Sequence, residues 1–287
     1  MKKWIAVLLL AWLAGCSTLK LAYNHSPSWI SYQLDVYLDL DDAQESALST
    51  QLDALHAWHR RHALPDYMSA LQTWSQWVLA GHQFTVDDIL DVQQQVEREL
   101  LRISSQAAVE MAPLVQKLTP KQIEHLRGKL EKSNRDYQKK YLSASTTEAS
   151  RRKERLEELE ERYENWLGRL TAEQKAVLSK TVDKQLVGSL LWSEERKARQ
   201  QALLRLLEES RTMSTMDAQK AWQSYFESLA RYQVPELESR RPLIRSEWAE
   251  VTANILNRMT ASQRQHLHKK LLGYASDVQA LLSQAPK

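Results

Sequence analysis

A cysteine near the start of the chain, Cys16, carries the clearest chemistry in the sequence. It closes the run Leu-Ala-Gly-Cys, which follows two lysines and an apolar stretch too short to cross a bilayer as a helix. Basic residues, a short apolar segment and small residues before a cysteine are typical of a bacterial lipoprotein signal peptide. We therefore predict a signal peptide at residues 1–15 and lipidation of Cys16, with palmitate among the acyl chains.

The lipid anchor also predicts where the protein is located. Acyl chains contribute about 0.8 kcal/mol per buried methylene, so several chains on Cys16 would hold the protein permanently at a membrane. The next residue is Ser17 rather than Asp, which favours the outer membrane. We expect the protein in the inner leaflet of a Gram-negative outer membrane, facing the periplasm, with the inner membrane as the alternative. Cys16 is the single cysteine, so no disulfide is expected.

Three histidines, His56, His59 and His62, are spaced by three residues in a segment predicted to be helical. Side chains three apart on a helix are neighbours, so two of these imidazoles could share a metal ion. Zinc and copper sites need more ligands, and no cysteine can supply them once Cys16 is acylated. We predict no metal and no cofactor, and we keep metal binding through these histidines as an alternative.

The sequence lacks the short motifs of common active sites. It has no Gly-x-Ser-x-Gly elbow, no phosphate-binding loop, no dinucleotide fingerprint and no His-Glu-x-x-His. Six glycines in 287 residues leave few places for tight catalytic turns. The formal net charge of +3 is too small to indicate nucleic-acid binding. We predict a protein without enzymatic activity, with no catalytic residue and no nucleic-acid partner.

A short pattern that predicts helix starts occurs four times. A Thr or Asp side chain at the N-cap accepts from a first-turn N–H, and a Gln three residues later reaches back to the N-cap N–H. The four pairs are Asp41 with Gln44, Thr119 with Gln122, Thr171 with Gln174, and Thr260 with Gln263. Their spacing has no fixed period, which argues against a solenoid. The pattern resembles the Leu-Thr-x-x-Gln signature of small α-helical periplasmic stress proteins and chaperones, which implies a chaperone-like or envelope-stress role as an alternative function.

Charged and aromatic residues gather after residue 22 and form the candidate binding surface. Its members are Asp35, Tyr37, Asp39, Trp58, His59 and Arg60. This stretch resembles a family of Gram-negative lipoproteins that combine Tyr-Asn, Asp-x-Tyr-x-Asp-Leu-x-x-x-Gln and Trp-His-Arg before Leu-Pro-x-Tyr. The resemblance covers about fifty residues. It implies an all-α lipoprotein and supplies no activity.

The elements that position these residues are predicted to be helices. The longest apolar stripe, from Ile89 to Leu114, repeats with steps of three and four, and no segment alternates as a strand would. We predict an all-α bundle or irregular helical array of about ten helices without strands. Residues 16–27 are expected as lipidated cysteine and tether. Residues 28–287 are expected as the periplasmic domain, with two halves meeting near 143–150 as an alternative.

Together, these observations predict a membrane-anchored, periplasm-facing protein without enzymatic activity. It would reach the membrane through the acyl chains on Cys16, and it would bind another envelope protein or act as an envelope scaffold.

Overall fold

The computed structural model describes residues 18–142, 147–186 and 189–284. These residues form eleven helices and no strand, so the predicted all-α class is confirmed. The helices are α2 Thr18–Leu38, α3 Asp42–His62, α4 Leu64–Leu79, α5 Val86–Val115, α6 Pro120–Tyr141, α7 Glu148–Leu167, α8 Ala172–Leu186, α9 Ser189–Ser210, α10 Thr215–Ser228, α11 Pro235–Asn257 and α12 Ala261–Leu282. The predicted signal peptide and Cys16 lie outside the described residues. Within them, no helix has the length and hydropathy needed to cross a membrane.

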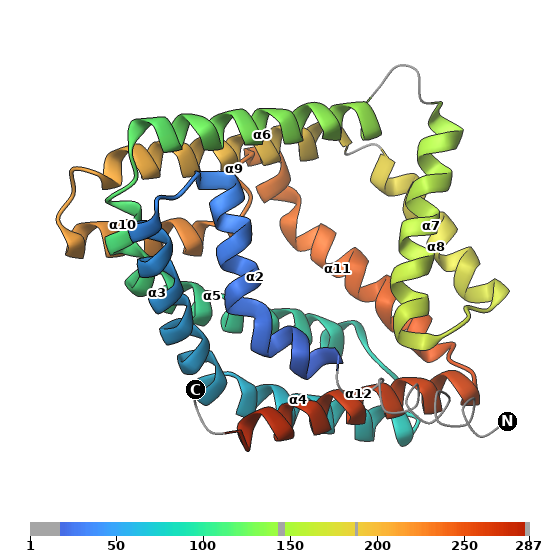
Figure 1. The fold of residues 1–287 in the computed structure, drawn as a ribbon. Coiled ribbons are helices and arrows are strands. Elements are labelled where there is room, and N and C mark those ends of the chain that lie inside the picture. The colour runs from blue at the N-terminus through green and yellow to red at the C-terminus, as the bar shows by residue number, and fades with distance from the viewer. Residues whose placement is uncertain (1–17, 143–146, 187–188, 285–287) are drawn as a thin grey trace, which may run out of the picture.

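The helices form a four-sided frame (Figure 1). Helices α6 and α9 pack together along one side, and α12 packs along α4 on the opposite side. The other two sides are the hairpins α2–α3 and α7–α8. Helix α11 runs across the middle of the frame and packs against α5 and α8. The largest group of buried apolar side chains lies where α4, α5, α7, α8, α11 and α12 meet.

All four predicted capping pairs form at helix starts. In each pair, the Asp or Thr side chain accepts from the N–H of the Gln, and the Gln side chain accepts from the N-cap N–H. Each pair stands in the connection between two consecutive helices: α2–α3, α5–α6, α7–α8 and α11–α12.

The four glutamines also form two buried pairs, a feature that the capping pattern did not predict. Gln44 and Gln122 exchange amide hydrogen bonds of 3.2 and 2.6 Å. Gln174 and Gln263 do the same at 3.1 and 2.9 Å. In addition, each amide nitrogen donates to a backbone carbonyl of the partner's connection: the acceptors are Lys117, Asp39, Ile255 and Arg169. Each pair thus joins two connections between helices. Every donor and acceptor of the four side-chain amides forms a hydrogen bond.

The two Gln pairs divide the chain into halves that repeat one arrangement. In the first half α2 packs on α3 and α6, and in the second α7 packs on α8 and α12. The last helix of each half packs on the other half: α6 packs on α9, and α12 packs on α4. Of the boundary expected near 143–150, residues 143–146 lie outside the described residues and α7 begins at Glu148. Contacts cross between the halves along two sides of the frame.

Helix α2 begins earlier than the sequence suggested. Residues 18–27 were expected as part of a tether that ends at Ser26-Pro27, but they form the first half of α2, with Pro27 inside the helix. Proline cannot donate to the carbonyl four residues earlier, here that of Tyr23. That carbonyl instead lies 2.8 Å from Ser26 Oγ and 3.1 Å from His56 Nε2. These substitute donors explain why the helix continues through the proline.

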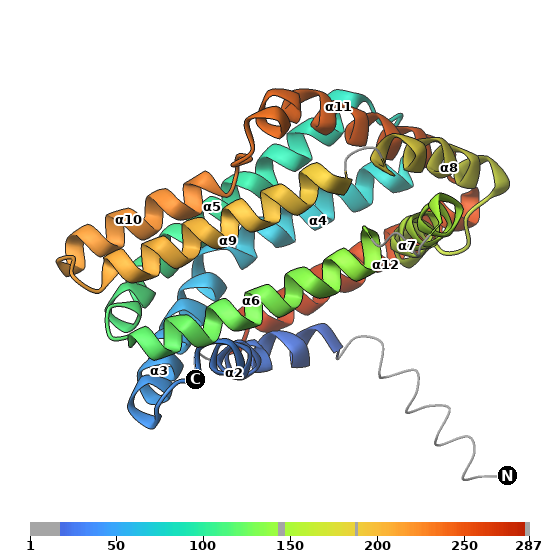
Figure 2. The ribbon, with the colours of Figure 1, turned by 90° about the horizontal axis from the view of Figure 1, so that it is seen from above.

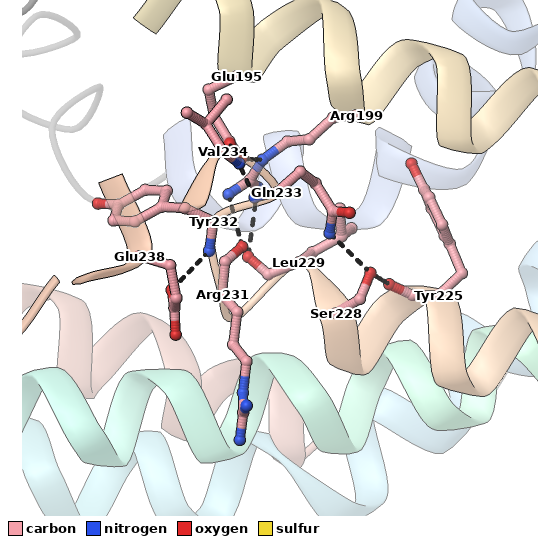
Figure 3. Close-up of polar contacts among 10 residues, drawn as sticks. All are labelled: Glu195, Arg199, Tyr225, Ser228, Leu229, Arg231, Tyr232, Gln233, Val234 and Glu238. Carbon is pink, nitrogen blue, oxygen red and sulfur yellow. Dashed lines mark hydrogen bonds and ion pairs between the residues drawn. The ribbon is translucent and has the colours of Figure 1, made fainter. Parts of the chain in front are cut away.

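The connection between α10 and α11 is held by an ion pair between a buried glutamate and a half-buried arginine (Figure 3). The Glu195 carboxylate, only 3 % exposed, binds Arg199 and also accepts from the N–H groups of Gln233 and Val234. Arg199 in turn donates to the carbonyl of Leu229 at 3.2 Å. Both charges are therefore used to fix the turn after α10. This turn directs α11 across the frame, whereas α5, at the corresponding place in the first half, continues as one helix.

Candidate functional site

The residues of the predicted binding surface lie at two separate places. Asp35 and Asp39 close the C-terminus of α2: the Asp35 carboxylate accepts from Leu40 N–H at 3.0 Å. Asp39 has a φ of 53°, a left-handed conformation that Asp tolerates at a helix end. Tyr37 is exposed on α2. The residues Trp58 to Arg60 stand near the far end of α3, a helix of 21 residues and thus about 30 Å long. The six residues therefore do not form one surface.

The second group joins α2, α3 and α4 through polar and aromatic contacts. His59 Nδ1 lies 3.1 Å from the Tyr23 hydroxyl, and Arg60 donates to Asn24 Oδ1 at 2.9 Å. The Arg60 guanidinium also lies over the Tyr23 ring, 5.6 Å from its centre. Trp58 stacks on the His62 ring at the end of α3, with ring centres 5.1 Å apart. These side chains bind each other, so the arrangement holds helices together.

The three histidines of α3 are each engaged by neighbouring groups. His56 Nε2 contacts the Tyr23 carbonyl, and His62 Nδ1 contacts the Trp58 carbonyl at 2.9 Å. Burial, with smaller contributions from the charges of His56 and Arg102, lowers the pKa of His59 to about 4. Among the described residues, no group of three or more His, Cys, Asp or Glu side chains could hold a metal ion. The metal alternative therefore gains no support from this arrangement.

A cleft lined by four tryptophans lies at the large apolar core. It has a volume of about 450 Å³ and is partly open to solvent. Helices α4, α5, α7, α11 and α12 supply its walls. The lining residues are Leu71, Trp74, Trp77, Val78, Phe84, Asp88, Ile89, Val92, Arg162, Tyr163, Trp166, Leu167, Trp248, Thr252, Leu256, Leu267 and Leu271. We call this region the tryptophan cleft. An open concave surface of this composition can bind apolar groups from outside the chain.

The apolar surface continues from the tryptophan cleft along α5. A second hollow, of about 350 Å³, shares Trp74 with the cleft and reaches Val96 and Leu100. These two residues belong to the long stripe of α5, yet they are 49 % and 59 % exposed. The structure buries the ends of this stripe, at Ile89 and Leu114, and leaves the middle uncovered.

Some charged side chains beside these two hollows have ion-pair or hydrogen-bond partners, and others have none. The carboxylates of Asp66 and Glu99 both bind Arg102, and Asp88 binds His82 and the Thr85 N–H. Arg98 and Arg162 also line the hollows, but neither makes a hydrogen bond or ion pair with another described residue. Three carboxylates and three guanidinium groups therefore surround the apolar surface, and the two groups that have no partner among the described residues, Arg98 and Arg162, are both cations.

The sequence places cleft residues such as Trp74, Trp166 and Trp248 on apolar helix faces, and it does not distinguish them from core residues. One signal could have pointed to the site: a stripe that spans about seven turns of one helix is longer than the partners of a single helix usually cover. The abundance of tryptophan, ten residues in the chain, was a second signal. Both are ambiguous without the fold, because an aromatic side chain on an amphipathic helix is most often buried.

Comparison with known proteins places the chain in a family. Comparisons with curated proteins and with solved structures find no match. A family described as a family of unknown function (DUF6279) matches residues 36–219, from the end of α2 into α10. This range covers more than half of the chain. It includes three of the four Gln capping pairs, the whole apolar stripe of α5 and the walls of the tryptophan cleft that come from α4, α5 and α7. The chain therefore belongs to the family of unknown function DUF6279.

Proposed function

We propose that this protein is a membrane-anchored binding protein of the bacterial envelope without enzymatic activity. In this proposal the tryptophan cleft holds an apolar segment of another envelope protein, and acyl chains on Cys16 supply the anchor. The single observation that carries the proposal is the cleft, where tryptophans from several helices remain half-buried or exposed. Trp166, for example, is 40 % exposed. Large aromatic side chains at a concave surface are the usual anchors of protein–protein recognition.

The free charges at the cleft indicate the chemistry of the bound segment. Arg98 and Arg162 are unpaired while the neighbouring carboxylates are engaged, so acidic residues beside the apolar segment would be favoured. Val96 and Leu100 are exposed and follow the half-buried Val92 in steps of four, and a helix lying in such a groove presents apolar residues in matching steps. The expected ligand is an amphipathic helix with glutamate or aspartate at its edges.

A peptide-binding measurement tests this proposal. The full acylated protein would be placed in lipid nanodiscs and titrated with a leucine- and phenylalanine-rich helical peptide flanked by glutamates. Empty nanodiscs report binding to lipid alone. Trp166→Ala, in the cleft, and Trp29→Ala, on the exposed face of α2, form a matched pair of tryptophan variants.

Trp166→Ala should weaken peptide binding about tenfold or more, since hot-spot residues contribute roughly 2 kcal/mol. Trp29→Ala should leave the affinity unchanged. A lysine-flanked peptide with the same apolar residues should bind more weakly than the acidic one, and Arg98→Glu with Arg162→Glu should reverse that preference. Equal affinity of both tryptophan variants and of the parent protein would overturn the assignment of the cleft. Binding to empty nanodiscs alone would show that the peptide recognises lipid.

A chaperone-like role is a second candidate, favoured by the open, adaptable apolar surface around Trp74 and Leu100. The glutamines of the Leu-Thr-x-x-Gln pattern are used for capping and pairing inside the fold, so this candidate now depends on the cleft. In the same preparation, a chaperone would bind several unrelated unfolded proteins with similar affinity and slow their aggregation. A protein with a dedicated partner would instead bind the acid-flanked helix much more tightly than those clients.

A further inference from the structure

The outward face of α2 is apolar and aromatic. Leu21, Trp29 and Tyr32 are 56 %, 63 % and 63 % exposed, and His25 between them is exposed too. The spacing of four, four and three residues places these side chains along one side of the helix. The row extends over about 16 Å of helix. Aromatic residues are exposed here in a pattern as regular as that of a buried helix face.

The other side of α2 already accounts for its packing. Tyr23, Leu34 and Leu38 face the core clusters, and the helix contacts α3, α6 and α12. In Figure 2, α2 lies near the lower edge of the molecule, with α3 to its left and α6 and α12 above it. The outer row of α2 is apolar as well, and no other described part of the chain covers it.

Charged side chains are scarce along α2, which suits the boundary between lipid and water. From residue 18 to residue 34 the single formally charged side chain is Lys20, and the first acidic residue is Asp35, beyond Tyr32. Lys20 lies near Asp277 of α12, and Arg61 lines a hollow together with Pro27 and Asp53. The outer face of α2 formed by Leu21, His25, Trp29 and Tyr32 thus carries apolar and aromatic groups and no acidic side chain.

We propose that the face of α2 formed by Leu21, His25, Trp29 and Tyr32 lies in the interfacial layer of the membrane that anchors the protein. This inference rests on the proposed lipid anchor at Cys16, whose Cα can be at most about 18 Å from that of Leu21 along the chain. Tryptophan and tyrosine favour the layer between lipid tails and water, and an amphipathic helix buries its apolar face there.

A second copy of the chain is a weaker match for this face. A stable dimer buries about 800 Å² on each partner, which one row of side chains on a single helix does not supply. The membrane needs no such area, because the acyl chains already hold the protein beside it. Contact through α2 would set this helix parallel to the bilayer and orient α3, α6 and α12 relative to the lipid.

Site-directed spin labelling of the full acylated protein tests this inference. Once Cys16 is acylated, a new cysteine is the single free thiol, so a nitroxide can be attached at Leu21→Cys or Trp29→Cys. Met216→Cys on α10, where Met216 is 61 % exposed, is the matched control. The proteins would be reconstituted in vesicles of phosphatidylethanolamine and phosphatidylglycerol. Relaxation by oxygen, which concentrates in lipid, is compared with relaxation by a water-soluble nickel chelate.

Labels at positions 21 and 29 should respond mainly to oxygen, and the label at 216 mainly to nickel. Replacing Trp29 and Tyr32 with serine should move the label at 21 into water while circular dichroism stays unchanged. If the protein remains on the vesicles but all labels respond to nickel, the α2 inference is wrong and the anchor stands. Release of the protein by washing would overturn the anchor. Spin–spin broadening that persists at high lipid dilution would assign the face to a second copy and overturn the inference.

Discussion

The four glutamines of the capping boxes do two tasks at once. Their side-chain oxygens complete the N-caps, and their nitrogens join two turns that are distant in sequence. Gln174 is fully buried, with each of its hydrogen-bonding positions occupied. A buried amide in a low-dielectric surrounding is stabilising when every partner is present and costly when one is removed. Each Gln pair therefore joins two turns, and a substitution of either glutamine should destabilise the fold.

Removal of one amide should destabilise the protein measurably. We expect Gln174→Ala to lower the free energy of unfolding by about 1–3 kcal/mol, because the partner amide, the cap N–H and a buried carbonyl lose hydrogen bonds. Gln72→Ala, at an exposed position on α4, should change it by less than about 0.5 kcal/mol. Urea denaturation followed by circular dichroism measures both values. Equal stability of the two variants would contradict a role for the pair.

For each of these glutamines, the sequence predicts the capping contact but not the partner glutamine. The capping contact is local, three residues along the chain, so the residue types Thr and Gln at that spacing suffice to predict it. The partner glutamine is 78 or 89 residues away. No local pattern contains that information, because it depends on how the hairpins pack.

Helices differ in how well their sequence pattern predicts their environment. For α6 and α12, the capping boxes and apolar spacing predict start and buried face, and Ile123, Leu126, Leu267 and Leu271 are buried as expected. For α5 the apolar stripe does not predict which part of the helix is buried. The stripe continues past the region that neighbouring helices cover, and the uncovered part becomes the extension of the tryptophan cleft. Helix α2 shows the same limit on its outer face.

The stripe of α5 should therefore respond unevenly to substitution. Leu114→Ala removes a side chain that is 4 % exposed and should cost about 2–5 kcal/mol of unfolding free energy, as core truncations do. Leu100→Ala, at a position that is 59 % exposed, should cost less than about 0.5 kcal/mol. Thermal and denaturant unfolding of the two variants measure the difference. A large loss of stability at Leu100 would mean that the middle of α5 is covered.

In the whole molecule, two similar halves are interlocked. Gln44 and Gln174 are followed at the same spacings by apolar residues, among them Leu48 and Leu178, which are both fully buried. Each half is closed by its own Gln pair, yet its last helix packs on the other half. Neither half therefore buries its apolar surface alone, and one cooperative unit is expected.

Matched core variants test this cooperativity. Leu48→Ala in the first half and Leu178→Ala in the second should each cost about 2–5 kcal/mol. Native-state hydrogen exchange should show that either substitution lowers the opening free energy of slow amides in both halves, because the halves unfold together. A loss confined to the half that carries the substitution would show two independent units.

Several properties are determined by the amino-acid sequence alone. The all-α class and the helix starts at the capping boxes depend on residues within a few positions of each other, and local spacing is enough to predict them. The lipoprotein signal is a local pattern too, and it stays a prediction. The tertiary structure decided the rest: which glutamines pair, which half receives which last helix, and which apolar faces stay uncovered. An apolar side chain on a helix has the same sequence pattern whether a neighbour covers it or not. Only the packing of distant helices distinguishes the core from the tryptophan cleft and from the outer face of α2.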